Sequence, residues 1–124
     1  MDLNELSYII RGAIFTVHNE LGPGLLESVY EMALAMELSL RGLKNETQIT
    51  LPVMYKDVQL EIGYRVDILV EDLVIIEIKS VESFHEKHKK VTLNYLKLSG
   101  KKLAFLINFN VLRLDKHSLI RIIN

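Results

Sequence analysis

The spacing of apolar residues predicts two helices at the start of the chain. Over residues 3–20, apolar side chains recur every three or four positions, which is the period of a helix with one buried face. Gly22-Pro23-Gly24 interrupts this pattern, and a second helical stretch follows at about 24–41. We expect the buried stripe of the second helix to contain Val29, Ala33, Met36 and Leu40.

Apolar and polar residues alternate from about residue 48 onward, which is the period of β-strands. The expected strands cover 48–56, 58–62, 64–70 and 73–79. The last two are apolar on both faces, as strands are in the covered centre of a sheet.

A third helix is expected after these strands. It begins in the sequence Ser83-Phe84-His85-Glu86, which has the form of a capping box, and it ends near Leu98. Strands at 103–109 and 119–123 follow, while the pattern of residues 111–114 does not distinguish between a strand and a loop. The side chains of this helix that we expect to face the core are Phe84, His88, Val91, Tyr95 and Leu98.

The predicted order of elements, α-α-β-β-β-β-α-β-β, indicates an α/β (α+β) fold in which helices cover both faces of a mixed sheet. With 124 residues and 49% apolar side chains, the chain is long and apolar enough for a single domain over residues 1–124. It contains no cysteine, which excludes disulfides, thiolate catalysis and cysteine-bound metals. No apolar run is long enough to span a membrane and the N-terminus lacks signal-peptide features, so we expect a cytoplasmic protein.

The charges divide the chain into an acidic and a basic part. Residues 1–86 contain 6 basic and 15 acidic side chains, whereas residues 87–124 contain 9 basic and 1 acidic side chain. This asymmetry is typical of a protein that binds a polyanion near an acidic, metal-binding centre. It is equally compatible with a fold in which an acidic face balances a basic face.

Three charged residues stand inside the apolar strands, where an unpaired charge is costly. They are Asp67 on one strand and Glu77 and Lys79 on the next. Side chains two positions apart on a strand share a face, so Glu77 and Lys79 lie on one side of the sheet. A three-residue loop at 71–73 would place Asp67 directly opposite Glu77, whereas a two-residue loop at 71–72 would turn Glu77 to the other face.

Two directly opposed carboxylates repel each other unless a cation lies between them. Because the ligands would be oxygen atoms, Mg²⁺ or Mn²⁺ is favoured over zinc. Lys79 would then orient a water molecule or stabilise charge that develops on a phosphate. The simpler interpretation is an ion pair between Glu77 and Lys79 on an exposed sheet face.

The second predicted helix contains a specific motif. Residues 22–31, Gly-Pro-Gly-Leu-Leu-Glu-Ser-Val-Tyr-Glu, match the pattern G-x-x-E-x-x-Y with Glu27 as the acid and Tyr30 as the tyrosine. Together with the segments 93–100 and 106–110, this motif resembles the GxxExxY protein family over nearly the whole chain. That family belongs to the PD-(D/E)XK nuclease-like superfamily.

The resemblance implies a restriction-endonuclease-like core and a site of carboxylates plus one lysine. Matched position by position, Glu27 is the helix acid and Asp67 is the acid of the second motif, although Val66 replaces the proline that names it. Glu77 and Lys79 match the third motif. Many relatives have glutamine on the following helix where this chain has Val91, a difference that affects a substrate or water contact rather than the metal ligands.

Two residues of the G-x-x-E-x-x-Y motif also have structural interpretations. Glu27 in the first turn of a helix is stabilised by the positive end of the helix dipole. For Tyr30 we expect a packing role between helix and sheet, with its hydroxyl bound to a carboxylate.

The third predicted helix has one polar stripe. Its members follow one another at spacings of three and four residues, so they share a face of the helix. Lysines in such a stripe bind phosphate backbones without recognising bases, and the same pattern is typical of the solvated face of an amphipathic helix. The stripe consists of Lys87, Lys90, Asn94 and Lys97.

We therefore predict a metal-dependent, nuclease-like domain that hydrolyses phosphodiester bonds of nucleic acid, with DNA preferred over RNA. Asp67 and Glu77 would hold Mg²⁺ or Mn²⁺, and Glu27 would complete the acidic cluster through a water or a second metal ion. Lys79 would position the attacking water. The alternatives are a non-catalytic nucleic-acid-binding or protein-interaction module of the same fold, and acids that form only structural ion pairs.

Two further expectations follow from these assignments. Clustered carboxylates raise one another's pKa, so at least one of the three acids should have a raised pKa without metal. A homodimer is also predicted, because so short a chain offers little surface to a duplex.

Overall fold

Three helices and five strands form the protein in the computed structural model, which describes residues 1–124. The helices are α1 (Leu3–Leu21), α2 (Glu27–Leu40) and α3 (Glu86–Ser99). The strands are β1 (Asn45–Tyr55), β2 (Val58–Val70), β3 (Val74–Lys79), β4 (Leu103–Asn108) and β5 (Leu119–Ile123).

All five strands belong to one sheet with the order β1-β2-β3-β4-β5. Strands β3 and β4 are parallel, and every other neighbouring pair is antiparallel. A parallel pair needs a crossover connection, and α3 supplies it between β3 and β4. The predicted α/β (α+β) class with a mixed sheet is therefore confirmed.

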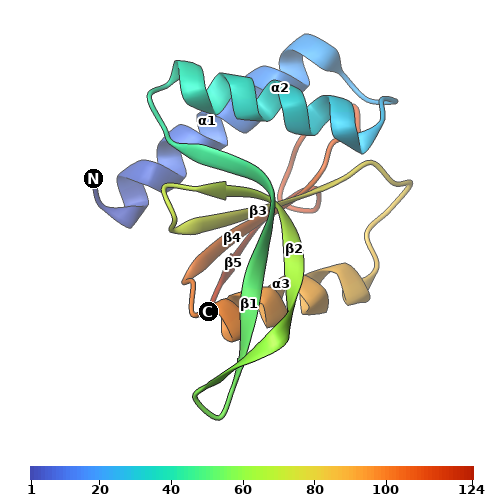
Figure 1. The fold of residues 1–124 in the computed structure, drawn as a ribbon. Coiled ribbons are helices and arrows are strands. Elements are labelled where there is room, and N and C mark those ends of the chain that lie inside the picture. Colours follow the sequence, from blue (N-terminus) through green and yellow to red (C-terminus); the bar gives the residue numbers. More distant parts are fainter.

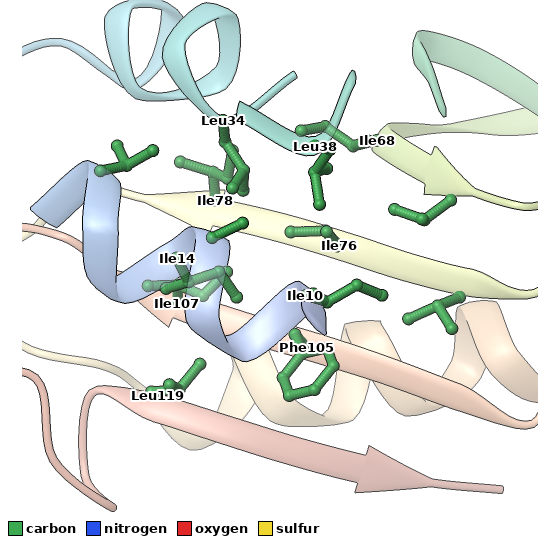
Figure 2. Packing of buried hydrophobic residues seen from close by; sticks show 14 of the residues in the cluster. Ile10, Ile14, Leu34, Leu38, Ile68, Ile76, Ile78, Phe105, Ile107 and Leu119 are labelled. Carbon is green, nitrogen blue, oxygen red and sulfur yellow. The ribbon is translucent and has the colours of Figure 1, made fainter. Parts of the chain in front are cut away.

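The helices cover the two faces of the sheet unequally. Helices α1 and α2 lie on one face and α3 lies on the other, as Figure 1 shows. The larger core fills the space beneath α1 and α2, where Ile10 and Leu34 pack over Ile76 and Phe105 (Figure 2). A smaller cluster around Leu96 fills the space beneath α3. None of the three helices is long and apolar enough to cross a bilayer.

The two strands expected at 58–62 and 64–70 form one continuous strand, β2, so three strands rather than four precede α3. Gly63 does not break the strand because it is paired with Pro52 in the β1–β2 ladder. A Cβ atom at Gly63 would lie 2.5 Å from the carbonyl oxygen of Leu51. The glycine therefore permits a close approach of two backbones, which the sequence pattern could not distinguish from a chain break.

The predicted buried stripe of α2 is wrong. The helix buries Tyr30, Leu34 and Leu38, whereas the expected core residues Met36 and Leu40 are 65% and 69% exposed. Both faces of α2 are apolar, so helical periodicity alone could not decide which one meets the sheet.

Helix α3 begins later than expected and buries different residues. Its N-cap is His85 rather than Ser83, and the ring Nδ1 of His88 accepts a hydrogen bond of 3.2 Å from the backbone N–H of His85. The buried residues are Thr92 and Leu96, while Val91 and Leu98 are exposed. The stacking of Tyr95 on Tyr64 of β2, with ring centroids 4.3 Å apart, defines the side of α3 that meets the sheet.

Candidate functional site

Strands β2 and β3 separate beside Asp67. Their ladder pairs Val70 with Val74 and ends with Ile68 opposite Ile76, so the connection at 71–73 has three residues. The next residues along the two strands are Asp67 and Glu77. The register is therefore the one in which the two carboxylates are opposite each other.

Side chain to backbone hydrogen bonds replace the ladder where the strands part. The backbone N–H of Ile78 donates to Oδ2 of Asp67 at 2.7 Å. In the other direction, the backbone N–H of Asp67 donates to Oε1 of Glu77 at 3.3 Å. Each carboxylate is thus held by the backbone of the opposite strand, which fixes the two acids close together at the end of β3.

Glu77 and Lys79 point to the α3 side of the sheet. On β3, Val74, Ile76 and Ile78 belong to the core beneath α1 and α2, and side chains alternate along a strand. Residues 75, 77 and 79 therefore point to the opposite face, where Ile75 joins the cluster beneath α3.

Glu77 is the most perturbed acid of the protein. It is 7% exposed, and burial together with the negative charge of Asp67 raises its pKa from 4.5 to about 8. The ammonium group of Lys79 opposes this rise but does not cancel it. The expectation that one acid of the cluster has a raised pKa is confirmed at Glu77.

Lys79 is half-buried and has no ion-pair partner. The three ion pairs of the protein join Arg41 to Glu37, Lys89 to Glu86 and Lys101 to Asp72.

The positive charge of Lys79 influences the titration of two neighbouring side chains, Glu77 on β3 and His88 in the first turn of α3. Burial is the main cause that lowers the pKa of His88, and the positive charge of Lys79 lowers it further. Lys79 thus lies within electrostatic reach of the first turn of α3 as well as of Glu77.

Glu27 binds the end of β3 rather than the other two acids. Its Oε2 accepts a hydrogen bond of 3.0 Å from the backbone N–H of Ser80, the residue that follows Lys79. The hydroxyl of Ser80 donates to the carbonyl oxygen of Leu25 at 2.7 Å, so two bonds fasten the start of α2 to the end of β3. No hydrogen bond joins Glu27 to Asp67 or Glu77, and no three acidic or histidine side chains converge as a ready metal site.

Two polar residues that the sequence analysis did not select extend the acidic cluster. The side-chain amide of Gln48 donates to Oδ1 of Asp67 at 3.3 Å and also to Oε1 of Glu31. Burial is the main cause that raises the pKa of Glu31, and the charge of Asp67 adds to it. Glu31 follows Glu27 by four residues and so shares its side of α2, which is a signal that could have revealed it.

No local pattern in the sequence could have revealed Gln48. It is an exposed residue on β1, and its φ of 52° lies in the left-handed region, which is uncommon for a residue other than glycine. Strained backbone of this kind is enriched at functional sites. Gln48 reaches Asp67 only because β1 pairs with β2 in the folded sheet.

Tyr30 has the structural role expected for it, but its hydroxyl binds backbone atoms instead of a carboxylate. The hydroxyl donates to the carbonyl oxygen of Gly22 at 2.6 Å and accepts from the backbone N–H of Leu25 at 3.2 Å. Its buried ring stacks on Phe109 with centroids 4.5 Å apart. Tyr30 therefore holds the loop that positions Glu27 at the start of α2.

The predicted polar stripe of α3 lies on the surface. All four members are exposed, and none of their side chains forms an ion pair. The exposed Val91 and Leu98 lie on the same side of the helix. We call this surface the α3 basic face; it consists of Lys87, Lys90, Asn94 and Lys97.

The geometry described above agrees with a comparison against protein families. A family model described as the PD-(D/E)XK nuclease superfamily matches residues 4–122. The match covers nearly the whole chain, so the protein belongs to the PD-(D/E)XK nuclease superfamily. Searches of curated proteins and of solved structures found no significant match. The superfamily implied by the sequence resemblance is confirmed, and membership of the GxxExxY family stays a prediction.

Proposed function

We propose that the protein hydrolyses phosphodiester bonds of nucleic acid with the help of a divalent metal ion. The observation that supports this most is the meeting of Asp67 and Glu77 where β2 leaves β3, with the unpaired Lys79 two residues farther along the strand. A buried acid beside an ammonium group that forms no ion pair is typical of a site for acid–base and electrostatic catalysis. In a purely structural role the two groups would be expected to form an ion pair with each other.

The donor set fits a hard divalent cation. Asp67 and Glu77 offer carboxylate oxygens, and the raised pKa of Glu77 means that a nearby positive charge would be stabilising. We propose that these two acids hold Mg²⁺ or Mn²⁺ and that Glu27 contributes through a water molecule or a second ion. When bound, such an ion polarises a phosphoryl oxygen and lowers the pKa of a bound water.

Lys79 has the role of orienting the attacking water. It shares a face with Glu77, and its ammonium group is not engaged by any carboxylate at bonding distance. A positive charge at this place also stabilises negative charge that develops on the phosphate in the transition state. Gln48 and Glu31 help by holding Asp67 through the hydrogen bonds of the Gln48 amide.

The proposed substrate is DNA in preference to RNA, and the proposed contact surface is the α3 basic face. Its lysines are exposed and free of ion pairs, so they are available to phosphate groups. Contacts of this kind are independent of base sequence and weaken with salt. We further propose a single domain over 1–124, a homodimer and a cytoplasmic location.

The second candidate function is a nucleic-acid-binding or protein-interaction module without catalysis. Two observations favour it. The carboxylate of Glu27 is engaged by the backbone of Ser80, and the position of the common glutamine on α3 is occupied by the exposed Val91. A module of this kind would keep the superfamily fold and the basic face but would not cleave.

A cleavage assay separates the two functions. Linear and circular DNA, single-stranded DNA and RNA are incubated with the wild type in Mg²⁺, Mn²⁺ or EDTA, beside Lys79→Ala and the control Lys44→Ala. Lys44 is exposed and only its backbone forms hydrogen bonds. We expect metal-dependent cleavage by the wild type and the control, and loss of turnover with retained binding in Lys79→Ala. Binding without cleavage would establish the nucleic-acid-binding module, and absence of both would refute the nuclease and the nucleic-acid-binding module, leaving the protein-interaction module.

A further inference from the structure

Helix α2 and the two residues before it expose a continuous apolar face. From residue 26 onward its members recur at spacings of three and four residues, and every member is between 37% and 74% exposed. In Figure 1 no other element lies on the outer side of α2. We call this surface the α2 apolar face; it consists of Leu25, Leu26, Val29, Met32, Met36 and Leu40.

This face is additional to the one that holds α2 on the sheet. The opposite side of the helix already buries Tyr30, Leu34 and Leu38 in the main core. The α2 apolar face is therefore not needed for packing within the chain. It exposes roughly 600 Å² per chain, the upper end of what monomeric proteins leave in contact with water.

The arrangement of the α2 apolar face is self-complementary. Val29 and Met36 lie at equal distances from the midpoint between residues 32 and 33, and so do Leu25 and Leu40. A second α2 packed antiparallel about a twofold axis at this midpoint places Val29 opposite Met36 in both directions. Leu25 then lies opposite Leu40 and Met32 opposite Ala33, and only Leu26, opposite Ser39, has a polar partner.

No charge opposes such a pairing. The acids of α2 lie away from the face, because Glu31 is bound by Gln48 and Glu37 forms a 3.1 Å ion pair with Arg41. Complete burial of the face in both copies would remove at most about 1,200 Å² from water, which is the lower limit of stable protein interfaces. The area and the absence of charge both suit a second copy of this chain.

We propose that the α2 apolar face is the interface of a homodimer in which two α2 helices pack antiparallel. This inference rests on the homodimer of the proposed function but not on its nuclease activity. Glu27 and Glu31 make their hydrogen bonds to Ser80 and Gln48, away from the interface. The dimer therefore leaves the acidic cluster of each copy open.

Analytical ultracentrifugation tests the interface. The wild type should sediment as a dimer at micromolar concentration, whereas Met32→Glu/Met36→Glu should be monomeric, with the affinity of the dimer reduced about 100-fold or more because four carboxylates would meet. The control is Tyr8→Glu, since Tyr8 is 80% exposed on α1 and lies outside the face. Circular dichroism and thermal unfolding of each variant verify that it is folded.

Cysteine cross-linking tests the antiparallel register. The chain contains no cysteine, so a single substitution introduces the only thiol. Met32→Cys lies beside the twofold axis and should form an intermolecular disulfide on mild oxidation, since disulfides need Cα atoms within about 7 Å. Leu40→Cys should not, because the two copies of this position are roughly 22 Å apart along the antiparallel helices.

Three results would overturn the proposal: a monomeric wild type at several hundred micromolar, unchanged dimerisation of Met32→Glu/Met36→Glu, or equal cross-linking at positions 32 and 40. All three measurements are independent of cleavage. A dimer without nuclease activity would support this interface and refute the catalytic function. A monomeric protein with nuclease activity would support the catalytic function and refute this interface.

Discussion

Replacing Glu77 by glutamine should change how stability depends on pH. Glu77 is buried beside Asp67, and its pKa is raised from 4.5 to about 8 in the folded protein. Between these two values the folded protein holds a proton that the unfolded chain has released. The stabilising effect of this proton is complete below pH 4.5 and is lost as the pH rises through 8. Glutamine cannot titrate and keeps the oxygen that accepts from the Asp67 backbone N–H.

The size of the effect follows from the two pKa values. Each pH unit within this window changes the free energy of unfolding by about 1.4 kcal/mol for one proton. Between pH 5 and pH 7 the wild type should therefore lose about 3 kcal/mol that Glu77→Gln does not lose. A difference of this size is a large fraction of the total stability of an ordinary domain.

Urea unfolding followed by circular dichroism at pH 5, 6, 7 and 8 in EDTA measures this difference. The stability of Glu77→Gln relative to the wild type should increase steadily with pH. The control is Glu20→Gln, which makes the same substitution at an exposed position at the end of α1, outside the acidic cluster. Parallel stability curves for the wild type and Glu77→Gln across this range would refute the argument that Glu77 is buried in its protonated form.

Three further predictions concern the metal, the motif tyrosine and the α3 basic face. Millimolar Mg²⁺ or Mn²⁺ should raise the melting temperature of the wild type but not of Asp67→Asn, because a ligand that binds only the folded state stabilises that state. Differential scanning fluorimetry measures the two melting temperatures, and equal shifts would contradict a metal site at Asp67. Tyr30→Phe should lower the free energy of unfolding by about 1 kcal/mol, measured with urea, because it removes two hydrogen bonds to partly buried backbone groups of the loop before α2. Exchanging the three lysines of the α3 basic face for alanine should weaken duplex binding for every sequence. In fluorescence anisotropy, the slope of log affinity against log salt should become shallower by roughly 0.9 for each phosphate that the variant no longer binds. An unchanged slope would show that this face does not contact the duplex.

Much of the site could be predicted from the sequence because its signals are local. Glu77 and Lys79 share a face through strand alternation alone, and charges inside apolar strands are costly enough to identify both residues and Asp67. The motif around Glu27 is likewise a short run on one helix. These patterns need only the geometry of a single element.

The remainder of the site depends on contacts between distant segments. Gln48 joins Asp67 and Glu31 only because β1 pairs with β2 beneath α2. Glu27 meets the backbone of Ser80, 53 positions along the chain, and not the other acids. Such contacts depend on the packing of whole elements, about which residue spacing contains no information.

Residue patterns alone were sufficient for the kinds of elements, their approximate bounds and the charged residues of the central strands, because each follows from backbone periodicity and the cost of burying charge. The three-residue loop that places Asp67 opposite Glu77 required the folded chain, since loops of two and three residues both suit the same local sequence. The choice of the buried apolar face of α2 required it as well. Both faces have helical spacing, and the stacking of Tyr30 on Phe109 selects the one that meets the sheet.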